Sequence, residues 1–208
     1  MRLRLLLGAV ALALVAVGVG RASAGTGVEP LTFHAPAPYR AFDNHELGVS
    51  ISDPGEGVSM ALEGFYRYGR AANDFSVRGG FADLNGSGGT RFLIGGDFRT
   101  QVVSYSESFP LDGSLTLGLG ANLGDGVDAY YIPVGISLGR RFDLEGSNTT
   151  FVPYAHPVIV PTFGGGESDV NFALGLGVDI RFSEQWAIRA SGGLGDIEGV
   201  GISVAYLR

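Results

Sequence analysis

The stretch from Val170 to Phe182 restricts the fold of this chain more than any other part. Every even position in it is a large apolar residue, and every odd position is small or polar. Successive side chains of a β-strand point to opposite faces, so this pattern predicts a strand with one apolar and one polar face. Strands of soluble sandwiches are usually about 5–6 residues long, whereas a strand that crosses a bilayer at a tilt needs about 9–11 residues. The stretch therefore favours a transmembrane β-strand with its large side chains facing lipid.

Composition supports this reading and excludes several classes of protein. Glycine accounts for 35 of the 208 residues, which disfavours helices. Cysteine is absent, which excludes a disulfide framework, thiolate metal sites and a lipid-anchored cysteine. The net charge is −7 at pH 7, which argues against nucleic acid as a partner. Beyond the first residues no apolar run approaches 18 residues, so no transmembrane helix is expected.

Residues 1–24 have the features of a cleaved export signal. Arg2 and Arg4 give a positive start, an apolar core follows, and Ala22-Ser23-Ala24 forms a small-residue cleavage site. A permanent N-terminal anchor is the less favoured interpretation, because the apolar run is short and ends in this motif. Residues 25–44 are rich in proline and show no alternation, which predicts an irregular lead-in. Residues 45–208 are then expected to form one barrel domain.

From Glu46 onward, alternating segments follow one another, separated by short clusters of Gly, Asp, Asn and Ser. The pattern predicts ten strands: about 45–53, 57–69, 74–84, 90–105, 113–123, 129–143, 150–162, 169–182, 185–194 and 199–207. Eight or twelve strands stay open, because the segments near 43–52 and 151–162 are weakly defined. Pro153, Pro157 and Pro161 interrupt the segment 150–162 and predict a bulge or an irregular strand there. The expected fold is all-β, a single antiparallel up-and-down transmembrane β-barrel.

The apolar faces of the predicted strands should form a lipid-facing band. Its members include Val58, Leu62, Val77, Leu117, Leu119 and Val178, with aromatic residues gathered toward both strand ends. Two aromatic girdles around an aliphatic band are typical of a transmembrane barrel. A soluble lipocalin-type barrel is the alternative, but it would place its large side chains inside and polar ones outside.

The stretch Asp179 to Ala190 resembles the penultimate periplasmic turn of small outer-membrane β-barrels of the opacity and porin-family type. A strand that ends in Phe182 meets a short polar turn and then a Trp186-apolar-Arg start, and the final strand ends near Tyr206. The resemblance implies an outer-membrane location, with membrane lipid, lipopolysaccharide and the barrel insertion machinery as partners, the last reading an aromatic residue near the end of the chain. Members of such families act as pores, adhesins, structural anchors or, rarely, lipid enzymes, so the resemblance does not fix the activity.

Charged residues on the predicted inner face are the main candidates for function. They are Glu63, Arg67, Arg78, Asp97, Arg99, Asp179, Arg181 and Arg189. Two interpretations compete: an ion-pair network that closes a narrow lumen, and the charged constriction of a small pore. Pairing of Asp179 with Arg181 is expected, and inward glycines predict a water-filled vestibule in the other half of the lumen. The preferred function is a structural or surface-interaction barrel with a closed lumen; the alternative is a narrow channel for small solutes.

Catalysis and cofactors have little support in the sequence. No nucleophile elbow accompanies His34, His45 or His156, so we expect no enzyme and no cofactor. Acidic residues gather in the predicted outward loops: Asp125, Asp128, Glu167 and Asp169. They predict either a solvated rim or a weak site for a hard divalent cation that bridges to lipopolysaccharide phosphates.

Overall fold

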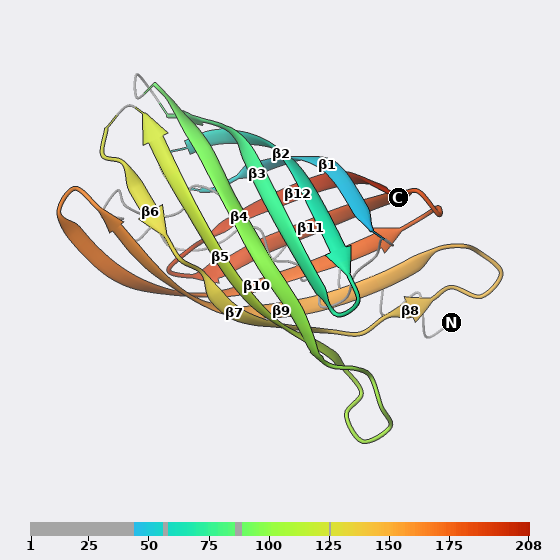
Figure 1. Cartoon of the computed structure of the whole chain (residues 1–208). Helices are drawn as coiled ribbons and strands as arrows, with labels where there is room; N and C mark the ends of the chain where they lie inside the picture. The colour runs from blue at the N-terminus through green and yellow to red at the C-terminus, as the bar shows by residue number, and fades with distance from the viewer. Residues whose placement is uncertain (1–43, 56–57, 86–88, 125) are drawn as a thin grey trace.

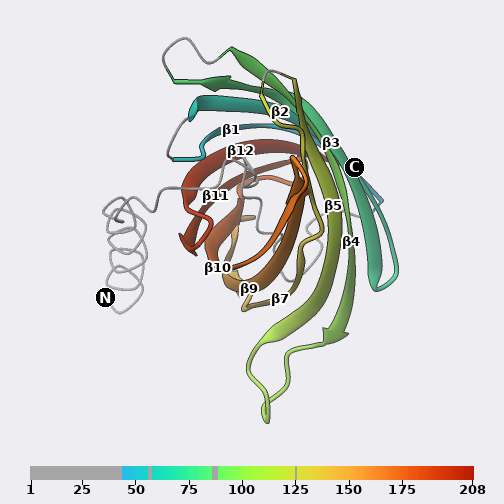
Figure 2. The ribbon, with the colours of Figure 1, turned by 90° about the vertical axis from the view of Figure 1, so that its left-hand side faces the viewer.

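The computed structural model describes residues 44–55, 58–85, 89–124 and 126–208, and these form a closed antiparallel β-barrel (Figures 1 and 2). The expected export signal and most of the lead-in lie outside the described residues. The strands are β1 (His45–Asp53), β2 (Val58–Arg70), β3 (Asn73–Leu84), β4 (Thr90–Val103), β5 (Asp112–Gly124), β6 (Ala129–Tyr131), β7 (Val134–Gly139), β8 (Phe142–Asp143), β9 (Thr150–Gly164), β10 (Glu167–Arg181), β11 (Trp186–Gly195) and β12 (Gly199–Leu207). The described part of the chain contains no helix with the length and apolar character needed to span a membrane.

The barrel closes where the first strand pairs with the last. β1 pairs antiparallel with β2 on one side and with β12 on the other, and the backbone N–H of Asn44 donates to the carbonyl of Arg208 at 3.1 Å. The beginning and end of the described chain therefore lie at the same end of the barrel, here called the termini end; the opposite end is the far end. The predicted all-β, up-and-down architecture is confirmed, and β6, β7 and β8 together occupy the sixth of its ten strand positions.

The three prolines of segment 150–162 leave their own strand, β9, intact, and the interruption expected of them occurs in the neighbouring strand. β9 is a continuous strand, and its register with β10 is unbroken from Thr150 to Gly164. The carbonyls of Pro153 and Pro161 point toward the other neighbour, where they accept hydrogen bonds from Arg140 and Ile132. The missing N–H groups of these prolines face the same way, because the N–H and C=O of one strand residue point to the same neighbour. The sixth strand is consequently the interrupted one, and the prediction of an irregular strand at 150–162 is wrong.

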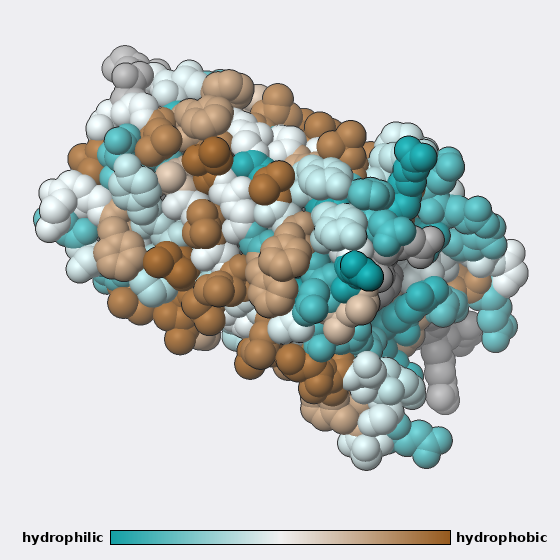
Figure 3. All heavy atoms as spheres, in the orientation of Figure 1, coloured by the Kyte–Doolittle hydropathy of each residue, from teal (hydrophilic) through white to brown (hydrophobic). Residues whose placement is uncertain are grey.

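The outward face carries an apolar band around the barrel. Leu47, Val77, Leu117, Leu119 and Val170 expose between 50% and 68% of their surface. Figure 3 shows apolar and weakly polar side chains over the middle of this face, while strongly polar ones gather at the termini end. Large apolar side chains thus point outward, which is the arrangement that the lipocalin alternative excludes.

Two residues expected in the band are buried. A β-bulge between Val58 and Met60 reverses the alternation at the start of β2, so that Val58 turns inward and packs with Ala61, Ala82 and Leu93. Val178 is buried as well, although the alternation of β10 is unbroken there and nothing in the described residues explains it.

Aromatic side chains pair across strands near both ends of the band. At the termini end, the ring centroids of Phe75 and Phe98 lie 4.8 Å apart, and those of Trp186 and Tyr206 lie 5.4 Å apart. At the far end, Phe81 and Phe92 make an edge contact at 5.6 Å. These cross-strand pairs occupy the positions predicted for the two girdles.

The longest connections lie at the termini end. Connections at the far end span 54–57, 85–89, 125–128, 165–166 and 196–198, whereas 104–111 and 144–149 are at the termini end. The hairpin at 104–111 projects beyond the barrel wall (Figures 1 and 2). The longer connections therefore lie at the same end of the barrel as both ends of the described chain.

We expect Ala71→Gly to raise the free energy of unfolding by about 1 kcal/mol. Ala71 begins the two-residue turn between β2 and β3 with φ of 53°, a conformation that glycine adopts without steric cost. Urea unfolding of the refolded barrel, followed by tryptophan fluorescence, measures the change. Ala72→Gly is the matched control and should be neutral or destabilising, because among the described non-glycine residues only Ala71 has a positive φ. Equal effects of the two substitutions would contradict the assignment of strain to Ala71.

Candidate functional site

The inner wall of β2, β3 and β4 carries a cluster of ion pairs near the termini end. Arg67 Nη1 lies 2.5 Å from Asp74 Oδ1 and 3.0 Å from Asp97 Oδ1. Arg99 lies on the other side of Asp74, with Nη2 at 2.6 Å from its Oδ2. The hydroxyl of Ser76 donates to Asp97. Arg67, Asp74 and Arg99 are buried. Each of these buried charges has a direct partner of opposite sign, without which its burial would be costly.

A second cluster joins β1, β10 and β11. The guanidinium of Arg189 donates to both carboxylate oxygens of Glu46, at 2.5 and 2.7 Å, and its Nε lies 2.5 Å from Asp179 Oδ2. Glu46 and Asp179 are almost completely buried. A two-pronged arginine–carboxylate contact of this kind is among the strongest hydrogen-bonded pairs in proteins.

The two clusters adjoin on the inner wall. Glu46 and Arg67 are direct cross-strand partners in the β1–β2 ladder, and Glu46 also interacts electrostatically with Arg67 and Arg99. Alternating charges therefore lie on β10, β11, β1, β2, β3 and β4, and Arg189 reaches across β12 to Glu46. A further pair, with 3.8 Å between Arg78 Nε and Glu63 Oε1, lies closer to the middle of β2 and β3.

Arg181 lies outside this network. Its Nε and Nη2 donate to the carbonyls of Ser183 and Glu184, at 3.1 and 3.0 Å, in the turn that follows β10. The ion-pair partner of Asp179 is Arg189 and not Arg181, because Arg181 is the last residue of its strand and its long side chain reaches the turn. The structure thus brings seven of the eight candidate charges to the inner wall and adds Glu46 and Asp74, which the sequence analysis missed.

Inward glycines do not line an open vestibule as expected. A Cβ on Gly120 would overlap the ring of Tyr131, and one on Gly177 would overlap the ring of Tyr154. Both tyrosines are buried, and each is the direct cross-strand partner of the glycine that it covers. His156 covers Gly135 in the same way, and its Nε2 lies 2.8 Å from the hydroxyl of Thr116. These three glycines therefore make room for large inward side chains beyond the ion pairs.

The carboxylates of the far-end rim bind backbone groups of their own loops. Asp128 accepts from the N–H of Gly124 at 3.2 Å, and Asp169 accepts from the N–H of Val170 at 2.7 Å. Asp125 lies outside the described residues. Among the residues that are described, no three or more His, Asp or Glu side chains gather where they could hold a metal ion. The cation site that includes Glu167 stays a prediction, while the observed contacts are those of ordinary loop-capping aspartates.

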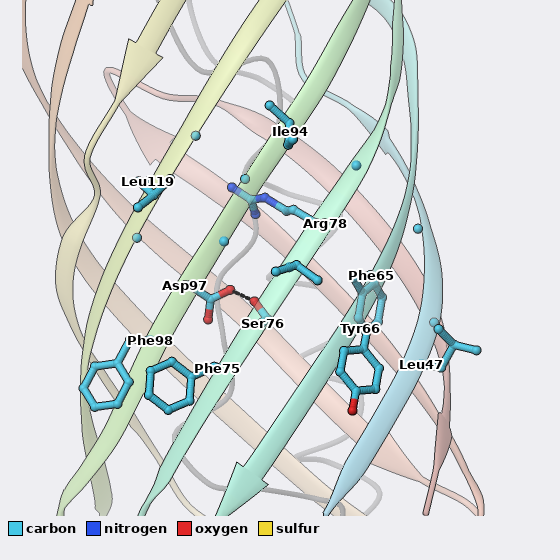
Figure 4. Close-up of a pocket in the computed structure, with 18 of the residues that line it drawn as sticks. Leu47, Phe65, Tyr66, Phe75, Ser76, Arg78, Ile94, Asp97, Phe98 and Leu119 are labelled. Atoms are coloured by element: carbon cyan, nitrogen blue, oxygen red, sulfur yellow. Dashed lines mark hydrogen bonds between the residues drawn. The ribbon is translucent and has the colours of Figure 1, made fainter.

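The outer wall of β1 to β5 contains a shallow apolar groove of about 1430 Å³. Tyr66, Phe75 and Phe98 flank it near the termini end, and Ile94 and Leu119 flank it farther up (Figure 4). The strands that form its floor also carry Ser76, Arg78 and Asp97, which belong to the inner network, so one layer of backbone separates the apolar groove from the charged lumen.

Comparisons with known proteins find similarity only among solved structures. No family model matches, and no curated protein sequence matches. A bacterial polysaccharide outer membrane secretin aligns over 79% of this chain with 12% identity and a TM-score of 0.47, and the chain spans 65% of its length. The β domain of the Bordetella autotransporter BrkA aligns over 79% of this chain and 98% of its own, with 15% identity and a TM-score of 0.44. A de novo designed transmembrane β-barrel aligns over 78% and 93%, with 15% identity and a TM-score of 0.40. Similarities this distant do not bear on function.

Proposed function

We propose that this protein is an integral outer-membrane β-barrel with both described ends in the periplasm. The apolar outward band, the two aromatic girdles and the polar inner face support this proposal, because a bilayer accommodates a β-structure only as a closed barrel with an apolar exterior. The expected export signal would deliver the chain to that membrane. Outer-membrane lipid, lipopolysaccharide and the insertion machinery are its partners in this proposal.

The lumen of the barrel is closed and the role is structural rather than catalytic. The observation that carries this proposal is the pair of adjoining ion-pair clusters on the inner wall, one on β10, β11 and β1 and the other on β2, β3 and β4. Every arginine of these two clusters lies 2.5–3.0 Å from a carboxylate, so paired side chains rather than hydrated charges line this part of the lumen. Tyr131 and Tyr154 fill the space beside them.

The surface for interaction with other molecules lies at the periplasmic end. The hairpin at 104–111 exposes Tyr105 and Phe109, while the far-end loops are short. The guanidinium carbon of Arg140 lies 5.0 Å from the ring centre of Tyr105 and 5.1 Å from that of Phe142, which holds the base of this hairpin against the barrel. A structural anchor that contacts periplasmic components fits this distribution better than an adhesin with long outward loops.

Solute flux into liposomes tests the proposal. The refolded protein, reconstituted into phospholipid liposomes and checked for heat-dependent migration as evidence of insertion, should give no more swelling in arabinose or glycine than empty liposomes. An open porin reconstituted in parallel provides the positive control. Swelling that grows with the amount of this protein would refute the closed lumen and favour the alternative, a narrow channel for small solutes.

A further inference from the structure

Three glycines leave a dent in the outward apolar band. Gly64 and Gly79 are direct cross-strand partners in β2 and β3, and Gly96 in β4 lies diagonally beside Gly79. A Cβ added to Gly64 would find its nearest atom at 4.0 Å, and one added to Gly79 at 3.6 Å, so packing does not require glycine at either position. Glycine within a strand costs about 0.5–1 kcal/mol relative to alanine. Gly64 and Gly79 therefore have a cost in stability that no close contact explains, whereas at Gly96 a Cβ would lie 2.8 Å from the carbonyl oxygen of Ser76.

The groove that contains this dent leads to a polar pocket at the edge of the band. Leu47 and Tyr206 line both the groove and a second pocket of about 600 Å³ at the termini end. Asn44, His45 and Arg208 complete the lining of that second pocket. An apolar channel at membrane depth thus continues into a polar pocket at the level of the girdle.

Arg208 supplies a guanidinium group to the lining of the polar pocket. Its backbone N–H donates to the carbonyl of His45 at 2.8 Å, and its carbonyl accepts from the N–H of His45 at 2.7 Å, so its position is fixed. Among the described residues, no Asp or Glu side chain lies within ion-pair distance of Arg208. His45 Nδ1 lies 2.7 Å from the hydroxyl of Tyr66 and provides a second polar wall.

We infer that the groove and the polar pocket together bind one phospholipid. An acyl chain lies over Gly64 and Gly79 between the aromatic walls, and the phosphate meets Arg208 at the membrane surface, where basic side chains attract anionic headgroups. This inference rests on the proposed membrane location, which makes lipid the available occupant. A flexible chain can follow a shallow groove that is open to hydrocarbon, and its burial adds dispersion contacts along the apolar walls.

A second copy of the barrel is the less suitable occupant. In a two-fold symmetric dimer centred on this site, the same patch of each copy meets itself. Two dents would then face each other and leave a void, which forfeits the contacts that stabilise an interface. An acyl chain has no such restriction.

Native mass spectrometry of the detergent-folded barrel with dioleoyl phosphatidylglycerol tests the inference. We expect one retained phospholipid on the unmodified protein. A Cβ fits at both positions, so Gly64→Leu/Gly79→Leu should fill the dent and lower retention at least tenfold, while the melting temperature should stay the same or rise. Arg208→Gln should lower retention of the phospholipid about fivefold but leave retention of dioleoylglycerol, which lacks the phosphate, unchanged. Val170→Leu, on the outward face of β10, is the matched control and should bind like the unmodified protein.

Three results would overturn the inference. These are no retained phospholipid on the unmodified barrel, equal retention by the glycine variant and the control, and a dimer that disappears in the glycine variant, which would identify a second copy as the occupant. If the glycine variant fails to fold, Arg208→Gln alone decides, and unchanged phosphatidylglycerol retention there refutes the site. A protein that stays soluble and folded without detergent would instead refute the proposed membrane location.

Discussion

Replacing Arg189 with alanine is expected to destabilise the barrel by about 3–5 kcal/mol. Arg189 is the shared partner of Glu46 and Asp179, and both carboxylates are almost completely buried. Its removal leaves two buried negative charges without compensation, which costs more than the pair itself contributes. Urea unfolding in detergent or in lipid vesicles, followed by tryptophan fluorescence, measures the loss.

Two control variants separate charge from packing. Arg181→Ala removes a guanidinium that binds turn carbonyls and should cost less than about 1 kcal/mol. The triple variant Glu46→Gln/Asp179→Asn/Arg189→Met removes all three charges together and should recover most of the stability lost in Arg189→Ala. If Arg181→Ala proves as damaging as Arg189→Ala, the assignment of Arg189 as the centre of the network is wrong.

Leu119→Arg is expected to cost about 2–4 kcal/mol when the barrel is folded in lipid vesicles. Leu119 lies in the middle part of β5 and exposes 68% of its surface on the outward face. An arginine there must enter the hydrocarbon core, and the penalty falls to about 0–1 kcal/mol near the membrane surface. Val102→Arg, at the termini end of β4, is the matched control and should change stability little. Equal, small effects at both positions would show that β5 does not face lipid.

Alternation along the strands was sufficient to predict the barrel and both of its faces. The same alternation places Glu46 on the inner face, because its neighbour Leu47 is on the outer face, and it places Asp74 next to outward Phe75 in the same way. Both of these network residues could therefore have been found from the sequence. The partner of Glu46 could not, because Glu46 and Arg189 are 143 residues apart and meet only through closure of the barrel. Register between distant strands is set by the whole ring of pairings and not by any local pattern.

Local patterns also failed where one strand acts on its neighbour. Proline was correctly identified as a residue that removes a ladder donor, but its effect appears in the sixth strand, opposite Pro153 and Pro161, and leaves β9 intact. The inward glycines predict a water-filled vestibule, whereas Tyr131 and Tyr154 from adjacent strands cover Gly120 and Gly177. In both cases the sequence shows the residue, and only the cross-strand partner shows its consequence.

Single-channel recording in planar bilayers tests the closed lumen most directly. The unmodified barrel, inserted from detergent into a planar phospholipid bilayer in potassium chloride, should show no steady conductance steps at moderate voltage in either polarity, because paired charges and buried tyrosines occupy its lumen. Insertion is verified independently by recovering heat-modifiable protein from vesicles prepared in the same way. Stable, uniform conductance steps from the unmodified protein would contradict this account and identify the barrel as a pore.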